Sequence, residues 1–260
     1  SPKNIEFSLI NNNKIMVGKS SKISNIYDVL IFACRDINNV EIPSTIKRIT
    51  PYSFSECRKL KSFLFCDNSE LISIGHYAFF SSSIERIIIP STTKYIERNA
   101  FCNCLNLKSV EFCDNSNLEE IDDFAFFGSS IRSISIPLKV TLIGDGAFKD
   151  CTCLNSIHFA NDSQLVSIYK SAFSNSSIIS SIIPPKMCFV AQLVFSSCKL
   201  LSIEFLGDNI SLDNYCFSSS KNLLVVSFPN ANQISKVRFS FSGLSPDLSI
   251  FVKPKVWLKP

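Results

Sequence analysis

Apolar residues recur along the chain in short groups with the pattern Leu/Ile-x-x-Ile/Val/Phe-x-Phe/Ile, and polar segments separate the groups. Inside each copy the apolar fourth and sixth positions alternate with polar ones. This period of two, rich in β-branched and aromatic residues, predicts a short strand with one buried face. The copies follow one another at steps of 22 to 24 residues and start at Ile37, Leu60, Ile84, Leu107, Ile131, Leu154, Ile178, Leu200, Leu223 and, in a weaker form, Asp247.

Pairs of copies form a longer unit of 47 residues. Residues 42–49 (IPSTIKRI) return as 89–96 (IPSTTKYI) and 136–143 (IPLKVTLI), and residues 65–71 (FCDNSEL) return as 112–118 (FCDNSNL). A single strand of this size cannot bury its face alone, so the copies must stack and share a continuous core. We therefore expect a right-handed, curved leucine-rich-repeat β-solenoid. About ten short parallel strands form its concave face, and short 3₁₀ or extended turns form its convex face.

Both ends of such a solenoid need a cap, because an open rung exposes apolar core and an unpaired strand edge. Residues 1–30 lack the register and are expected to be the amino-terminal cap. Residues 31–246 then form the solenoid, with about nine repeats of 22–24 residues, and residues 247–260 supply the last strand and a carboxyl-terminal cap with Trp257 as a lid. The residues expected to cover the first rung are Phe7, Leu9, Ile15, Val17 and Ile23.

The composition supports a repeated core position that takes phenylalanine. The chain has 23 Phe but only 6 Tyr and 1 Trp. We expect a stacked ladder of rings, in which each buried Phe contributes roughly 2 to 3 kcal/mol. Because only 7 Gly are present, Asn, Asp, Ser and Pro are expected to make the turns. The ladder is predicted from two series with a spacing of 47 and their continuation: Phe32, Phe79, Phe126 and Phe173; Phe54, Phe101, Phe148 and Phe195; then Phe217 and Phe239.

One repeat carries a recognisable register. Residues 84–91 read Ile-x-x-Ile-x-Ile-Pro-Ser, and residues 95–107 continue as Tyr-Ile-x-x-x-Ala-Phe-x-x-Cys-x-x-Leu. This register resembles the BspA-like class of leucine-rich repeats, and the resemblance covers roughly residues 30–252. It implies a cell-surface protein of a host-associated bacterium or parasitic protist that takes part in adhesion. The chain departs from the pattern because Cys occupies its position only in alternate halves, and because residues 208–211 (DNIS) replace the expected unit after Leu206.

Several functional classes find no support. The net charge of +4 is spread singly along the chain, so no nucleic-acid-binding patch is expected. No apolar run of about 18 residues is present, so this segment is not expected to insert into a membrane, and residues 1–6 do not resemble a secretory signal. His76 and His158 are the only histidines, neither with an expected nucleophile or base partner, and no hydrolase, zinc-protease or phosphate-loop motif occurs. We expect no catalysis and no cofactor.

The eleven cysteines are mostly explained by the repeat. One row comes three residues after each ladder Phe, with Ser82, Ser129 and Ser176 in the same place of the other halves, and buried thiols there behave as small hydrophobes. A second row contains Cys66 and Cys113. The two C-x-C pairs lie two rungs apart, on the order of 9 to 10 Å, which is too far to share a zinc ion. The first row is Cys57, Cys104, Cys151 and Cys198.

The strand register also predicts which residues face a partner on the concave sheet. Its central outward row is Glu41, Leu64, Ile88, Glu111, Ser135, His158, Ile182, Glu204, Ser227 and Phe251, and a row of mostly serines flanks it. Two alternatives are a merely solvated sheet and a binding surface on the convex side, with Lys47, Arg48, Lys94 and Arg98. The expected binding residues are Lys61, Leu64, Arg86, Ile88, Lys108, Glu111, Arg132 and His158.

Two functional hypotheses follow. The first is a non-enzymatic adhesion module, at the cell surface or secreted, that binds a host-cell or matrix protein or the surface protein of another cell, and is itself expected to be monomeric. The alternative is a cytoplasmic leucine-rich-repeat scaffold for protein–protein interaction, which the many free thiols favour because reducing compartments keep Cys reduced.

Overall fold

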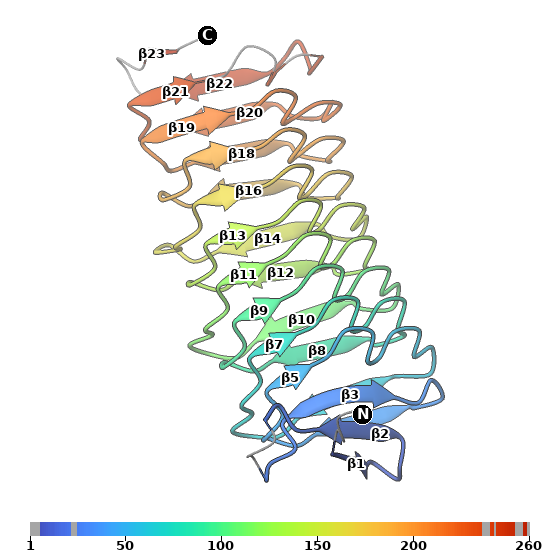
Figure 1. Cartoon of the computed structure of the whole chain (residues 1–260). Coiled ribbons are helices and arrows are strands. Elements are labelled where there is room, and N and C mark those ends of the chain that lie inside the picture. Colours follow the sequence, from blue (N-terminus) through green and yellow to red (C-terminus); the bar gives the residue numbers. More distant parts are fainter. Residues whose placement is uncertain (1–5, 22–24, 236–239, 242, 253–256, 259–260) are drawn as a thin grey trace, which may run out of the picture.

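The computed structural model describes residues 6–21, 25–235, 240–241, 243–252 and 257–258, and these form a β-solenoid of parallel strands (Figure 1). Turns stack from the amino-terminal end to the carboxyl-terminal end, and each adds one rung to two sheets. No helix of any kind, and hence none that could cross a membrane, occurs in these ranges. The predicted solenoid is confirmed.

Ten four-residue strands form the face predicted from the hydrophobic pattern, here called the long-strand sheet. Each strand covers the third to sixth positions of its repeat, and the inward residues of most of them are buried. Its strands are β4 (Asn39–Ile42), β6 (Ser62–Phe65), β8 (Arg86–Ile89), β10 (Ser109–Phe112), β12 (Ser133–Ile136), β14 (Ser156–Phe159), β16 (Ser180–Ile183), β18 (Ser202–Phe205), β20 (Val225–Phe228) and β22 (Ser249–Val252).

The opposite side is a second parallel sheet rather than a set of isolated turns. Of the two expected forms, extended chain is therefore right, and no 3₁₀ helix is found in the part of the chain that the structure describes. Residues 208–211, where the repeat pattern fails, still keep the register, because they enter a longer strand of this sheet, β19. We call it the short-strand sheet; it contains β5 (Arg48–Ile49), β7 (Ser73–Ile74), β9 (Tyr95–Ile96), β11 (Glu120–Ile121), β13 (Leu142–Ile143), β15 (Ser167–Ile168), β17 (Phe189–Val190), β19 (Asn209–Leu212), β21 (Gln233–Ser235) and β23 (Trp257–Leu258).

An antiparallel meander begins the short-strand sheet: β1 (Phe7–Ile10), β2 (Ile15–Gly18) and β3 (Val29–Ala33). Ile15 and Val17 on β2 are buried, as expected for a cap. The same expectation is wrong for Phe7 and Leu9, which are exposed because β1 is the last strand of the sheet, one strand further from the core.

Other parts of the expected caps fall partly outside the described residues. Ile23 of the amino-terminal cap and residues 253–256 and 259–260 of the carboxyl-terminal tail lie outside the described residues. Trp257 lies on β23, which pairs with β21, and its role as a lid remains a prediction. The strand β22 at this end is exposed along its whole length.

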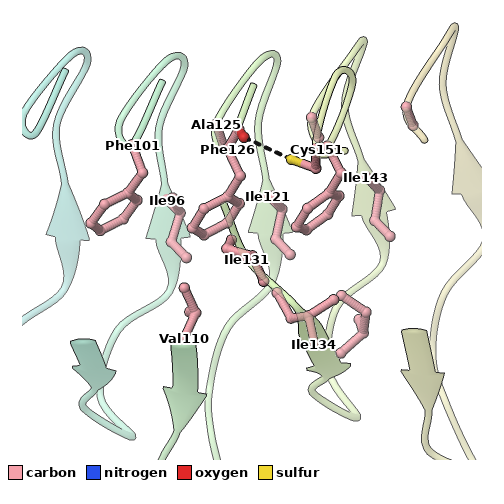
Figure 2. Packing of buried hydrophobic residues seen from close by; sticks show 14 of the residues in the cluster. Ile96, Phe101, Val110, Ile121, Ala125, Phe126, Ile131, Ile134, Ile143 and Cys151 are labelled. Atoms are coloured by element: carbon pink, nitrogen blue, oxygen red, sulfur yellow. Dashed lines mark hydrogen bonds between the residues drawn. The ribbon is translucent and has the colours of Figure 1, made fainter. Parts of the chain in front are cut away.

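The phenylalanine ladder runs through the core between the two sheets (Figure 2). Rings of successive turns lie nearly parallel, with centroid distances from 4.9 Å for Phe79 and Phe101 to 5.9 Å for Phe195 and Phe217. These distances fall in the range favourable for offset stacking. The stack consists of Phe54, Phe79, Phe101, Phe126, Phe148, Phe173, Phe195, Phe217 and Phe241.

Phe32 does not belong to the ladder, contrary to the prediction. The strands β3 and β5 pair Leu30 with Ile49. A ladder Phe follows this buried position by five residues, as Phe54 does, so the equivalent residue of the first turn is Arg35. The ring of Phe32 is 42% exposed and lies 4.8 Å from the Arg35 guanidinium. At the other end Phe241 continues the stack, and the predicted Phe239 lies outside the described residues.

The turns after β5 to β19 contain left-handed backbone, mostly at residues other than glycine. Two residues four apart adopt positive φ in each of these turns, for example Tyr52 at 62° and Glu56 at 56°, and glycine holds two of these positions, Gly128 and Gly146. The left-handed conformation costs a non-glycine residue roughly 1 to 2 kcal/mol of conformational free energy. Hydrogen bonds to the next turn offset that loss: the amide of Tyr52 donates to the carbonyl of His76 at 3.0 Å, and that of Glu56 to Phe80 at 2.7 Å. Asn, Asp and Ser hold many of these positions, as expected, but large side chains also occur there.

One strand carries a polar residue in the inward row. Ser181 on β16 occupies the position of Ile157 on β14 and Ile203 on β18, and only 6% of it is exposed. Its hydroxyl has no hydrogen-bond partner among the described residues. A buried hydroxyl without a partner costs about 1 to 3 kcal/mol, so this rung is less stable than its neighbours.

We expect Phe148→Ala to lower the free energy of unfolding by about 3 to 5 kcal/mol, because it removes a fully buried ring that stacks on both sides. Phe32→Ala is the matched control and should cost less than about 1 kcal/mol. Urea unfolding followed by circular dichroism measures both values. Equal losses for the two variants would show that the register given for the first turn is wrong.

Ser181→Val should raise the free energy of unfolding by about 1 to 2 kcal/mol, since it replaces an unpartnered buried hydroxyl with a side chain found at the same position of other strands, as in Val226. Ser180→Val, on the exposed face of the same strand, should change it by less than about 0.5 kcal/mol. Thermal or urea unfolding compares the pair, and a destabilised Ser181→Val protein would contradict the assignment.

Candidate functional site

The outward row of the long-strand sheet presents most of the residues expected to bind a partner. Cross-strand neighbours in this row include Glu41 and Leu64, and Ile88 and Glu111. Of the ten residues of the central row only Glu204 and Ser227 are partly buried, and the others are exposed. All eight predicted binding residues are exposed: Lys61, Leu64, Arg86, Ile88, Lys108, Glu111, Arg132 and His158.

The fold places these eight residues on five successive strands, with His158 at the end of the group. Lys61 and Arg132 mark the two ends of the other seven, which lie on or just before the strands β6, β8, β10 and β12. His158 follows on β14, opposite Ser135 of β12, so one strand, β12, separates it from Glu111 on β10. The candidate site is therefore the amino-terminal half of the sheet.

Charge distinguishes the two faces of the solenoid. No ion pair within the described ranges involves Lys61, Arg86, Lys108 or Arg132. On the rival surface of the short-strand side, Lys47 lies 3.5 Å from Glu70 and Lys94 lies 2.9 Å from Glu119. The guanidinium of Arg98 there lies 5.9 Å from the ring centroid of Phe124. Both lysines of the rival surface are thus ion-paired, whereas Arg48 beside them is exposed and, like the four cations of the long-strand sheet, makes no ion pair in the described structure.

The long-strand sheet is also interrupted at regular places. Four residues pair between β4 and β6, β8 and β10, β12 and β14, and β16 and β18. Only one residue pairs between β10 and β12 and between β14 and β16. Between β6 and β8 the sheet order has no pairing at all.

The three strands at these interruptions share a proline directly after the strand, although a proline alone does not interrupt pairing, because Pro229 follows β20, which pairs with β18 at three residues. The strands β8, β12 and β16, which follow the interruptions, end in Ile-Pro, and a proline has no amide hydrogen to donate to the preceding strand. The step across each interruption is 24 residues, a length that also occurs once without interruption, between Leu223 and Asp247. The pattern of outward residues did not predict the interruptions of the long-strand sheet. The alternation of Ile-Pro with Phe-Cys-Asp-Asn after successive strands could have indicated them.

Two of the interruptions open into grooves. The first groove, between β6 and β8, has a volume of about 600 Å³ and an apolar wall formed by Leu64, Phe65, Ile88 and Pro90. Cys66, Asp67 and Glu70 lie toward its other end. The second groove, across β14, β16 and β18, has a volume of about 520 Å³. Its lining combines apolar residues, among them Ile157, Ile182 and Val225, with the polar residues Ser156, His158, Ser180, Ser202 and Glu204.

The predicted cysteine row is built into the core. Cys151 donates to the carbonyl of Phe126 (Figure 2) and Cys104 to that of Phe79, both at 3.0 Å. Ser220 makes the equivalent bond to Phe195, so a hydroxyl and a thiol are interchangeable here. Burial raises the pKa of Cys104 and Cys151 to about 12, which disfavours the reactive thiolate. These thiols are structural.

Little in the described residues suggests chemistry. His76 does have an acidic neighbour, contrary to expectation, because its Nε2 lies 3.6 Å from Glu97 Oε2. Both groups are on the surface of the short-strand side, where an ion pair of this kind is worth little. Within the described residues no group of three or more His, Cys, Asp or Glu side chains is placed to hold a metal ion.

Comparison with known proteins identifies the repeat. The sequence profile of the BspA type leucine rich repeat region matches residues 6–107, 72–201 and 143–250. No curated protein matches the chain. Among solved structures, the pneumococcal vaccine antigen PcpA is similar at 17% identity with a TM-score of 0.59, over 96% of this chain and 71% of that one. A leucine-rich repeat protein of Bacteroides ovatus has 21% identity and a TM-score of 0.47, over 100% of this chain and 78% of that one.

The buried thiols make stability depend on pH in a defined direction. Their folded-state pKa values, about 11 to 12, lie above the ordinary value of 9.0, so unfolded thiols ionise first. Stability is full below pH 9 and falls as pH rises toward 12, by about 1 kcal/mol per pH unit for each thiol. Cys151→Ser should reduce this fall by one thiol's share, and Cys104→Ser with Cys151→Ser by two. Urea unfolding at pH 8 and pH 10 in a reductant measures it; an unchanged slope would contradict the burial.

Proposed function

This chain belongs to the BspA-type leucine-rich repeat family, and on that premise we propose that it is a non-enzymatic module that binds a protein partner through the long-strand sheet. Solenoids of this kind offer extended surfaces, and binding is their usual use. The long-strand sheet extends over ten turns, and the first and second grooves on it are open rather than enclosed sites.

The observation that carries the proposal is a set of unpaired cations beside exposed apolar side chains. Leu64 and Ile88 are 46% and 44% exposed, and Arg86 and Lys108 lie on or just before the strands β8 and β10. Exposed large apolar residues next to arginine are typical of the centre of protein interfaces. On the short-strand side the equivalent lysines are held by Glu70 and Glu119, which leaves less charge for a partner.

We place the centre of the proposed interface on seven residues of the amino-terminal half and His158 at its margin. All seven residues are exposed and lie on or just before neighbouring strands. The four cations among them also make no ion pair in the described structure. They are Lys61, Leu64, Arg86, Ile88, Lys108, Glu111 and Arg132.

We propose a location at the cell surface or outside the cell, with a partner that is a host-cell or matrix protein or the surface protein of another cell. Family membership supports this location. The second candidate is a cytoplasmic scaffold, which is favoured by one observation: all eleven cysteines are free thiols in the structure. Counting the thiols of the natural protein, isolated without reductant and then denatured, decides between them, because paired cysteines would exclude the cytoplasmic alternative.

Reversal of two central charges should abolish most of the binding. We expect Arg86→Glu together with Lys108→Glu to weaken binding of the labelled chain to cultured epithelial cells at least tenfold, which corresponds to about 1.4 kcal/mol. Flow cytometry measures the binding isotherm. Trypsin treatment of the cells before the assay should remove the binding sites, because the proposed partner is a protein.

Lys47→Glu together with Lys94→Glu is the matched control, since it reverses the same number of charges on the short-strand side. This control should change the affinity less than threefold. If the control variant lost as much binding as the test variant, the short-strand side or the overall charge would be responsible. If neither variant lost binding, the proposal for the long-strand sheet would be wrong.

A further inference from the structure

We propose that the first groove is an anchor pocket, which takes one large apolar side chain of an extended acidic segment of the partner. This inference rests on the proposed function and specifies the partner's chemistry. It depends on three observations about β6 and β8: the missing backbone pairing, the apolar wall and the unequal charge at the two ends.

The missing pairing creates the space. No hydrogen bond joins β6 to β8 in the described structure, whereas four residues pair on the far side of each strand, with β4 and with β10. Pro90, directly after β8, has no amide hydrogen to donate to the preceding turn. The groove of about 600 Å³ lies where the pairing is missing.

The wall of the groove selects an apolar group. Leu64 rises from β6 and Ile88 from β8, so the two exposed side chains stand on opposite sides of the gap. Phe65 lies partly buried between them and the core. An apolar side chain of the partner that enters here would remove both exposed residues from water, which is the main source of affinity at the centre of an interface.

The charges at the two ends give the bound segment a direction. At the end where the strands start, Lys61, Arg86 and Lys108 are free of ion pairs among the described residues. At the other end lie Asp67 and Glu70, and Glu70 contacts Lys47. Arg86 is two residues from Ile88, or roughly 7 Å along a strand. The acidic residue of the partner is therefore expected two or three positions from its apolar anchor.

The second groove provides an internal comparison. It has one strongly exposed apolar residue, Ile182, and no lysine or arginine lines either groove. The grooves differ in the residues directly before their strands: Lys61, Glu85 and Lys108, with Arg86 next, stand beside the first, and Asn155, Ile179 and Leu201 beside the second. Ile182 lies in the same outward row as Ile88, so it is a matched control for substitution.

The test does not require a known partner, because peptide ligands are first selected from a random library. Random peptides of about 12 residues displayed on phage are selected on the immobilised full chain. We expect the enriched peptides to carry Leu, Ile, Met, Phe or Trp with Asp or Glu two or three positions away. The affinity of one enriched synthetic peptide is then measured by fluorescence anisotropy for each variant.

Leu64→Ser together with Ile88→Ser should weaken that peptide at least tenfold, and Ile182→Ser less than twofold. Serine occupies the equivalent outward position on β12 as Ser135, so the fold tolerates it; unchanged circular dichroism and unfolding midpoint confirm this for each variant. A control peptide with Lys in place of its acidic residues should bind at least tenfold more weakly.

Each other outcome overturns the inference. If Arg86→Glu with Lys108→Glu weakens the peptide but the two serine substitutions do not, the anchor pocket is wrong while the binding sheet remains. If neither pair matters, both proposals fail for this ligand. If no peptide is enriched and heparin binds instead with the same dependence on Arg86 and Lys108, the ligand is an anionic glycan and the proposed protein segment is wrong.

Discussion

The regular distance between successive turns is the constraint on which this structure depends. Paired parallel strands fix that distance near 4.8 Å, and every side chain that recurs in the core must fit it. Phenylalanine rings satisfy this condition, because nearly parallel rings about 5 Å apart are in favourable contact. The thiols and hydroxyls of the cysteine row satisfy it too, since each donates to a carbonyl of a neighbouring turn. Stacking thus turns one repeat into a continuous core.

The same constraint explains where the surface becomes irregular. Prolines without an amide hydrogen follow β8, β12 and β16, and the pairing of these three strands with the preceding strand is lost or reduced to one residue. Pro229 follows β20 in the same way, but β20 still pairs with β18 at three residues. The short-strand sheet has no such prolines in its strands and stays continuous across these positions. One sheet therefore holds the turns together, and the other can open into grooves without loss of the fold.

The proposed binding surface consists of the residues that do not repeat from turn to turn. The buried rows are nearly identical from turn to turn, and they serve stability alone. The outward positions vary freely, and in the amino-terminal half they gather apolar side chains and cations that no acidic residue in the described structure neutralises. On the opposite side, pairs such as Lys94 and Glu119 satisfy their own charges.

The sequence by itself determined the long strands, their inward rows and most of the ladder, because a period of two and a repeat of 47 residues leave little freedom once turns must stack. It also predicted the exposure of the eight candidate residues, since exposure follows from strand alternation. Only the tertiary structure decided the rest. Phe32 has the right spacing but the wrong register, because the first turn pairs through Leu30 and Ile49. The loss of pairing between β6 and β8, and the capture of Lys47 by Glu70, likewise depend on contacts between turns that are far apart in sequence.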